Sequence, residues 1–284
     1  GTIDVASFIY THKGVAPSMD GSAATFAGTG TLRFDLTAAT TFTVNTGAGT
    51  IGTNVEVRNP ANVAAFVFNL AGNNLTVAGN MTLTAGGSTG TTAFDVNALT
   101  LTCTGANVTM GSNTSFAATG GAGVLRLNAA TPPQTFTFSG TPTIVNLRIS
   151  NNVTLAGAGT SLTVTGTLTH DGGVLDFSTR NLTSSGTYTR TGGSYSATSG
   201  YFIFSGAGAN FQQGNTDYSI PNLRLTNTAA ASMTGTGVLT VTTALDVNNP
   251  AGAFTHTVSA AKKLKVADAA TVNYTAGSFD ASLD

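Results

Sequence analysis

Charged residues are scarce in this chain. Charged residues make up 8% of its 284 positions, against roughly 25% in an ordinary soluble domain. There are 11 Lys plus Arg and 12 Asp plus Glu, a net charge of −1, and only one of the acids, Glu56, is glutamate. Nucleic-acid binding needs clustered positive charge, so this composition argues against a nucleic-acid partner.

Cysteine is scarce, and tryptophan and long apolar runs are missing. The single cysteine, Cys103, excludes a disulfide within the chain. It continues the alternation that starts at Leu99 and Leu101, which places it on the same strand face as these leucines and predicts a small core residue. No run of ~18 apolar residues is present, so we expect no insertion into a membrane.

The groups that carry catalysis are few and scattered. The histidines, His12, His170 and His256, lie far apart and lack a second ligand at metal spacing. Asp171 and Asp176 are the closest useful pair of carboxylates, yet glycosidases need two facing carboxylates with residues that hold sugar, and there is no Trp. No stretch fits a phosphate loop or a calcium-binding repeat. We therefore predict no catalytic residue, cofactor or metal, and a polysaccharide-degrading enzyme is the least favoured class.

Threonine, serine, asparagine and 35 glycines take the place of the missing charge. Threonine favours strands, whereas glycine and asparagine favour tight turns. Apolar residues alternate with threonine in segments such as Leu162–Leu168, the pattern of strands with one buried face. The chain is therefore predicted to be all-β.

Internal repeats are the most informative feature of the sequence. Segments of similar pattern recur in the same order, for example 30–34 with 123–127, 54–57 with 146–149 and 222–225, and 75–77 with 162–164 and 239–241. The matches divide the chain into a non-repeat segment 1–29 and a single solenoid 30–284, made of modules 30–122, 123–200 and 201–284. Each module holds about four units of roughly 20 residues, and stacked units of this size are typical of a β-solenoid.

Two architectures suit such repeats. A β-solenoid of about 12–14 rungs is favoured, and a row of tandem β-sandwiches is the alternative. No Pro- or Ser-rich hinge separates the modules, which disfavours the sandwiches.

The segments 73–87 (NNLTVAGNMTLTAGG) and 160–189 (TSLTVTGTLTHDGGVLDFSTRNLTSSGTYT) resemble the Thr/Gly/Asn-rich repeats of large secreted bacterial surface proteins and adhesins, such as autotransporter passengers and filamentous-haemagglutinin-like proteins. The resemblance is one of repeat style and covers about 30–284. It implies a right-handed parallel β-helix and a secreted, cell-surface location.

The two ends of a solenoid are normally capped, because an end rung has one neighbouring rung and presents unpaired N–H and C=O groups. The sequence stops soon after a full module without a capping helix, and segment 1–29 either covers one end or reaches into a neighbouring copy. Two open ends on one chain would give a head-to-tail contact that does not close, hence a homopolymeric filament, sheath or matrix. The candidate inter-subunit contacts are Ile3, Val5, Phe8, Ile9, Tyr10, Tyr274, Phe279 and Leu283.

Two surface patterns support an alternative of another class, an adhesin or binding module. Thr-x-Thr pairs, such as Thr82/Thr84 and Thr163/Thr165, would form a hydroxyl lattice able to bind glycan or ice, although they do not recur at one fixed spacing. Asn-x-Ser/Thr motifs occur at seven places and predict glycosylation only in a suitable host. These lie at Asn74, Asn80, Asn107, Asn113, Asn152, Asn181 and Asn273.

Overall fold

The computed structural model describes residues 2–4, 7–14, 18–20, 25–36, 41–46, 49–60, 66–86, 90–206, 210–212, 214–227, 231–256 and 264–280. Every regular element in these residues is a β-strand. The chain forms two compact units, the first of residues 1–146 and 157–159 and the second of residues 147–156 and 160–284. Val5 and Leu283, both predicted contacts, lie outside the described residues.

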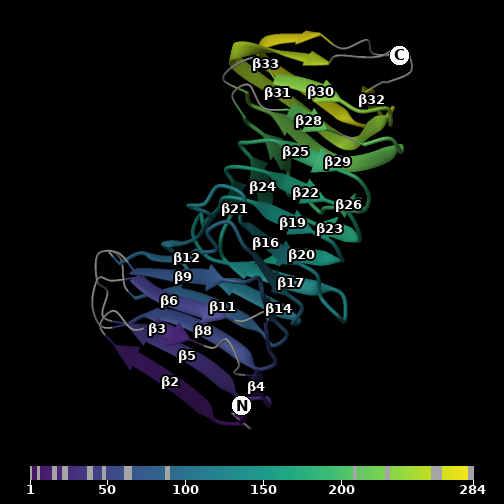
Figure 1. The fold of residues 1–284 in the computed structure, drawn as a ribbon. Helices are drawn as coiled ribbons and strands as arrows, with labels where there is room; N and C mark the ends of the chain where they lie inside the picture. The colour runs from purple at the N-terminus through teal and green to yellow at the C-terminus, as the bar shows by residue number, and fades with distance from the viewer. Residues whose placement is uncertain are drawn as a thin grey trace. The chain divides into compact units, whose positions relative to one another are not determined.

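The strands of the first unit stack in three ladders, and successive strands of the chain enter ladders I, II and III in turn (Figure 1). Ladder I holds β1 (Thr2–Asp4), β4 (Thr25–Ala27), β7 (Gly49–Ile51), β10 (Leu75–Val77), β13 (Thr100–Cys103) and β16 (Val124–Leu127). Ladder II holds β2 (Ile9–Gly14), β5 (Thr31–Leu36), β8 (Asn54–Asn59), β11 (Met81–Ala85), β14 (Asn107–Met110) and β17 (Gln134–Phe138). Ladder III holds β3 (Ser18–Asp20), β6 (Thr41–Thr46), β9 (Phe66–Gly72), β12 (Thr92–Asp95), β15 (Thr114–Ala117) and β18 (Thr143–Ile144).

The second unit repeats this arrangement. Its ladder I holds β19 (Leu147–Ile149), β22 (Leu168–His170), β25 (Tyr188–Arg190), β28 (Asn210–Gln212) and β30 (Ala231–Thr234). Its ladder II holds β20 (Val153–Ala156), β23 (Val174–Asp176) and β26 (Ser194–Ser196), and its ladder III holds β21 (Ser161–Val164), β24 (Asn181–Ser184) and β27 (Phe202–Phe204). The last strands are β29 (Tyr218–Leu225), β31 (Leu239–His256), β32 (Leu264–Val266) and β33 (Thr271–Asp280).

All registers between the described strands are parallel, which confirms the β-solenoid and excludes tandem β-sandwiches for this part of the chain. Partners lie from 20 positions apart, as Ser161 and Asn181, to 28 positions apart, as Asn107 and Thr135. The solenoid has about nine turns, one for each described strand of ladder II from β2 to β26, where the sequence predicted 12–14 rungs. After β26 the strands are longer and less regular, because β29 pairs with both β27 and β31, and the register between β31 and β33 shifts twice.

The parallel register brings the inward side chains of each ladder into columns. In ladder III of the first unit, Phe42, Phe68, Phe94 and Phe116 are register partners on successive turns. Their ring centroids are 5.3, 4.7 and 5.5 Å apart, within the range of favourable aromatic pairs. All four side chains are buried, so the apolar-Thr alternation of the sequence becomes a continuous stacked core.

The second unit has a comparable column in its ladder III. Leu162, Leu182, Phe202, Leu223 and Leu245 are register partners from turn to turn and are all buried. Each such residue gains its burial from the turns above and below, because a single turn cannot enclose its own apolar side chains. Stability is therefore shared between neighbouring turns.

Asparagines at one corner of the first unit connect successive turns through their side chains. The Asn80 backbone N–H donates to Asn54 Oδ1 at 2.9 Å, and the Asn107 backbone N–H donates to Asn80 Oδ1 at 3.0 Å. Asn152 and Asn181 accept in the same way from backbone N–H groups in the second unit. These corner N–H groups would otherwise lack a partner, so several of the predicted glycosylation asparagines have a structural role.

Candidate functional site

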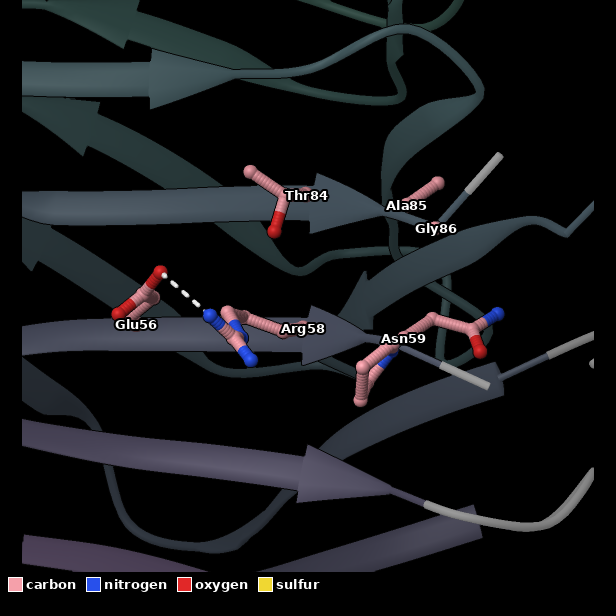
Figure 2. Close-up of a pocket in the computed structure, with 7 residues that line it drawn as sticks. Glu56, Arg58, Asn59, Thr84, Ala85 and Gly86 are labelled. Atoms are coloured by element: carbon pink, nitrogen blue, oxygen red, sulfur yellow. Dashed lines mark ion pairs between the residues drawn. The ribbon is translucent and has the colours of Figure 1, made fainter. Parts of the chain in front are cut away.

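One open groove of about 380 Å³ lies beside the ends of β8 and β11 in the first unit (Figure 2). Its lining is polar and small, with one carboxylate and one guanidinium. Figure 2 shows Glu56 and Arg58 on β8, joined by an ion pair, with Thr84 on the adjacent strand β11. The lining residues are Glu56, Arg58, Asn59, Pro60, Thr84, Ala85 and Gly86.

The charges at this groove neutralise one another across two turns. Arg33 Nε donates to Glu56 Oε2 at 2.7 Å, and Arg58 Nε donates to Asp35 Oδ1 at 2.8 Å. Arg58 Nη1 lies 3.9 Å from Glu56 Oε1. Two cations and two anions therefore form one continuous chain of ion pairs, in which both carboxylates have arginine partners.

The groove brings one carboxylate, Glu56, into contact with two guanidinium groups. The groove lining contains no serine, cysteine, histidine or lysine.

The first turn carries the exposed apolar residues that the sequence analysis selected. Phe8, Ile9 and Tyr10 are 74%, 53% and 46% exposed. Among the described strands, β2 has β5 as its hydrogen-bonded neighbour, and the register pairs Tyr10 with Leu32, which is fully buried. Tyr10 thus occupies an inward position of the solenoid but is open to solvent on one side.

The last described strand, β33, shows a matching feature. Val272 pairs in register with Leu245; Leu245 is 2% exposed, whereas Val272 is 55% exposed. Two predicted contacts, Tyr274 and Phe279, lie on the same strand, paired in register with Val247 and Phe254. Sequence reasoning missed Val272, although its place in a Thr-Val-Asn-Tyr alternation at the end of the repeats could have indicated it.

Ile3 completes the set of predicted contacts that the described strands contain. It lies on β1 and pairs in register with Phe26, a buried residue of ladder I. Ile3, Tyr10 and Phe279 therefore share one property, since each lies on the first or last described turn and is paired in register with the neighbouring turn.

The titratable residues of the described part do not converge on a metal site. No group of three or more His, Cys, Asp or Glu residues there could hold a metal ion. Cys103 is buried, and burial raises the pKa of its thiol to about 12, so its thiolate is not populated near neutral pH. His170 is buried in the second unit. Asp171 is paired with Arg148, whose Nη2 lies 2.5 Å from Asp171 Oδ2.

Threonines form single columns on the outer faces rather than a double lattice. Thr82 pairs with Thr109 and Thr109 with Thr137 on successive turns of ladder II. The other threonine of the pair Thr135/Thr137 does not start a second column of threonines, because Thr135 pairs in register with Asn107. A regular hydroxyl lattice two residues wide is therefore not formed on this face of the described strands.

No helix in the described part of the chain is long and apolar enough to cross a membrane. Comparisons with protein-family models, with curated proteins and with solved structures found no match. The fold and the distribution of exposed apolar residues are thus the observations on which a function can be argued.

Proposed function

We propose that this chain is a structural subunit of an extracellular filament, sheath or matrix, assembled by end-to-end association of β-solenoids. The observation that carries the proposal is the exposure of inward register positions on the first and the last described turns. Tyr10 is 46% exposed above a buried Leu32, and Val272 is 55% exposed above a buried Leu245. The partner is a second copy of the chain, and neither a cofactor nor a metal takes part.

The parallel winding supports a head-to-tail contact. In a parallel solenoid, the first turn offers one edge of its strands and the last turn offers the opposite edge. A second copy can therefore place its first turn on the last turn of its neighbour, where it continues both hydrogen-bonding and core columns. Such a heterologous contact leaves both outer ends free and produces an open polymer.

The outer faces favour a durable polymer over a binding enzyme. Their charges are few and mutually paired, as in the network of Arg33, Glu56, Arg58 and Asp35. Backbone N–H groups are engaged between turns and at the corners. Chains with this dense pairing offer few unpaired segments to proteases. The extracellular location rests on the resemblance in repeat style to secreted bacterial surface proteins.

One observation favours a second candidate, an adhesin-like module that binds glycan or ice. The column of Thr82, Thr109 and Thr137 presents hydroxyl groups at the spacing of successive turns, about 4.8 Å. The column is one residue wide, and ice binding needs a broader regular surface. For this reason we place the binding module second.

Negative-stain electron microscopy of the purified chain tests the structural role. Long fibres of uniform width, growing with protein concentration, are the expected result. Monodisperse particles at every concentration would contradict the proposal. Monodisperse particles that also bind glycan arrays or change the growth of ice crystals would establish the second candidate instead.

A further inference from the structure

Four side chains with aromatic or charged polar groups lie together inside the second unit. They are His170 on β22, Arg190 on β25, Tyr195 on β26 and Tyr218 on β29, and we call them the polar cluster. His170 and Arg190 are register partners on adjacent turns, 0% and 4% exposed. The His170 and Tyr195 rings are 4.9 Å apart, and Arg190 Cζ lies 4.0 Å from the centre of the Tyr218 ring.

Each member of the polar cluster has a buried polar atom without a hydrogen-bond partner among the described protein atoms. These atoms are His170 Nδ1, Arg190 Nε, Tyr195 Oη and Tyr218 Oη. A buried polar atom that stays unpaired costs about 1–3 kcal/mol. Three of these atoms, Arg190 Nε and the two tyrosine hydroxyls, are donors in one cluster of contacting side chains, which points to a shared acceptor.

The charge of the cluster indicates the nature of that partner. The Arg190 guanidinium donates from Nη2 to Gly193 O at 2.6 Å and from Nη1 to Thr216 Oγ1 at 3.2 Å. Both acceptors are neutral, and no carboxylate of the described residues forms an ion pair with it. Burial lowers the pKa of Arg190. A buried cation without a counter-charge is costly, so an anion fits this place and a metal cation does not.

The free atoms suit a small anion. Arg190 Nε–H and the two tyrosine hydroxyls are donors. His170 Nε2 lies 3.1 Å from Gly172 O, which places the proton on Nε2 and makes Nδ1 an acceptor that does not help to hold an anion. The backbone packs closely around His170, since a Cβ on Gly193, where φ is +78°, would lie 2.3 Å from His170 Nε2. An ion of one atom is the anion that needs the least space, so we choose it over phosphate or a carboxylic acid.

We propose that the polar cluster of the second unit binds a halide ion, with chloride as its natural occupant, through Arg190, Tyr195 and Tyr218. The ion neutralises Arg190 and accepts from the two hydroxyls, and it stabilises the solenoid from within. This site is independent of the proposed end-to-end assembly, because it lies on inward positions of β22, β25, β26 and β29.

Thermal unfolding of the full chain in sodium chloride and in sodium gluconate, at equal ionic strength, provides the test. We expect the midpoint to rise by about 2–4 °C between ~10 and ~200 mM chloride, and to stay constant over the same range of gluconate. Broadening of the chloride NMR line by the protein gives a direct measure of binding. A buried water in place of the ion would leave the midpoint equal in both salts and the line unbroadened, which would overturn the proposal.

Tyr218→Phe and Tyr195→Phe make the test independent of a folding defect. Each removes a single hydroxyl and keeps the ring. If the hydroxyls hold chloride, each variant binds chloride at least about tenfold more weakly than the parent. Each variant is then less stable than the parent in chloride but not in gluconate. If the hydroxyls are merely unpaired, each variant is as stable as the parent or more stable in both salts, and the proposal fails.

Tyr188→Phe is the matched control. Its hydroxyl is also buried and unpaired, but its ring contacts Phe202 and Phe211, at 4.9 and 4.6 Å, outside the polar cluster. We expect the response of this variant to chloride to equal that of the parent. An equal loss of the chloride response in Tyr188→Phe and Tyr218→Phe would show a general salt effect and contradict the site.

Discussion

Tyr10 and Leu32 occupy equivalent positions on adjacent turns, yet Tyr10 is 46% exposed and Leu32 is fully buried. The difference arises because Leu32 has described turns on both sides, through β2 and β8, whereas Tyr10 has β5 alone. The same contrast separates Val272 from Leu245 at the other end of the described strands. Apolar side chains that are exposed in register with a core column are suited to receive another turn.

Charge placed on either end should block association without unfolding the chain. Tyr10→Lys and Val272→Lys each put an ammonium group where the proposed contact would bury it, and a buried unpaired charge is strongly unfavourable. We expect both variants to stay monomeric in light scattering at concentrations where the parent polymerises. Thr82→Lys, on an outer face, serves as the control and should polymerise like the parent. Equal polymerisation of all three variants would refute an end contact.

The phenylalanine column predicts a large loss of stability on truncation. Phe68→Ala removes a ring that stacks on Phe42 and Phe94 at 5.3 and 4.7 Å. We expect a cost of about 3–5 kcal/mol in chemical denaturation, as for other buried phenylalanines. Val67→Ala, at a partly exposed position of the same strand, should cost less than ~1 kcal/mol. Similar costs at the two positions would contradict the assignment of Phe68 to a stacked core.

The alternation of the sequence predicted which residues of such strands face inward. Leu162 and Val164 are buried, and Thr163 between them is partly exposed. The alternation also predicted the burial of Cys103. These predictions succeed because a strand fixes the direction of each side chain locally.

The alternation did not predict which strands pair between turns, or in which register. The segment 30–34 was matched with 123–127, yet the strands within them, β5 and β16, belong to different sheets, since the turns vary from 20 to 28 residues. The division into three modules stays a prediction. The ion pair of Arg33 with Glu56, 23 positions apart, depends on this register and was therefore not predicted. The burial of Arg190 breaks the rule that charged residues face outward, so composition gave no indication of the polar cluster.

The corner asparagines provide a third test of the fold. In Asn80→Ala, the Asn107 backbone N–H loses its acceptor at 3.0 Å, which should destabilise the chain by about 1–2 kcal/mol. Asn80→Asp keeps an acceptor oxygen in the same place and should recover most of the loss. Hydrogen exchange at the Asn107 amide measures the effect directly. An exchange rate unchanged in Asn80→Ala would show that this side chain does not connect the turns.

Stability should fall in acid because of His170. Burial, and then the nearby Arg190, lowers the pKa of His170 from 6.5 to about 4. Between pH ~6.5 and ~4 the unfolded chain therefore binds a proton that the folded chain does not. The contribution of His170 is fully present above pH ~6.5, decreases as the pH falls, and is constant below pH ~4. The total change is on the order of 3 kcal/mol.

Carboxylates also titrate below pH ~5, so the effect is isolated by comparison with a variant. We expect the free energy of unfolding of His170→Phe to change less than that of the parent between pH 7 and 4. Parallel pH profiles for the two proteins would show that His170 is not held neutral in the folded chain.

End-to-end association is the central claim, and disulfide trapping measures it most directly. In a Cys103→Ala background, Phe8→Cys and Val272→Cys place one thiol at each end. A chain with both cysteines should form a ladder of covalent oligomers on oxidation, whereas a chain with either one alone should form no ladder. Two outcomes would contradict head-to-tail assembly. In one, the single variants form dimers and the double variant forms no ladder; in the other, all the variants stay monomeric.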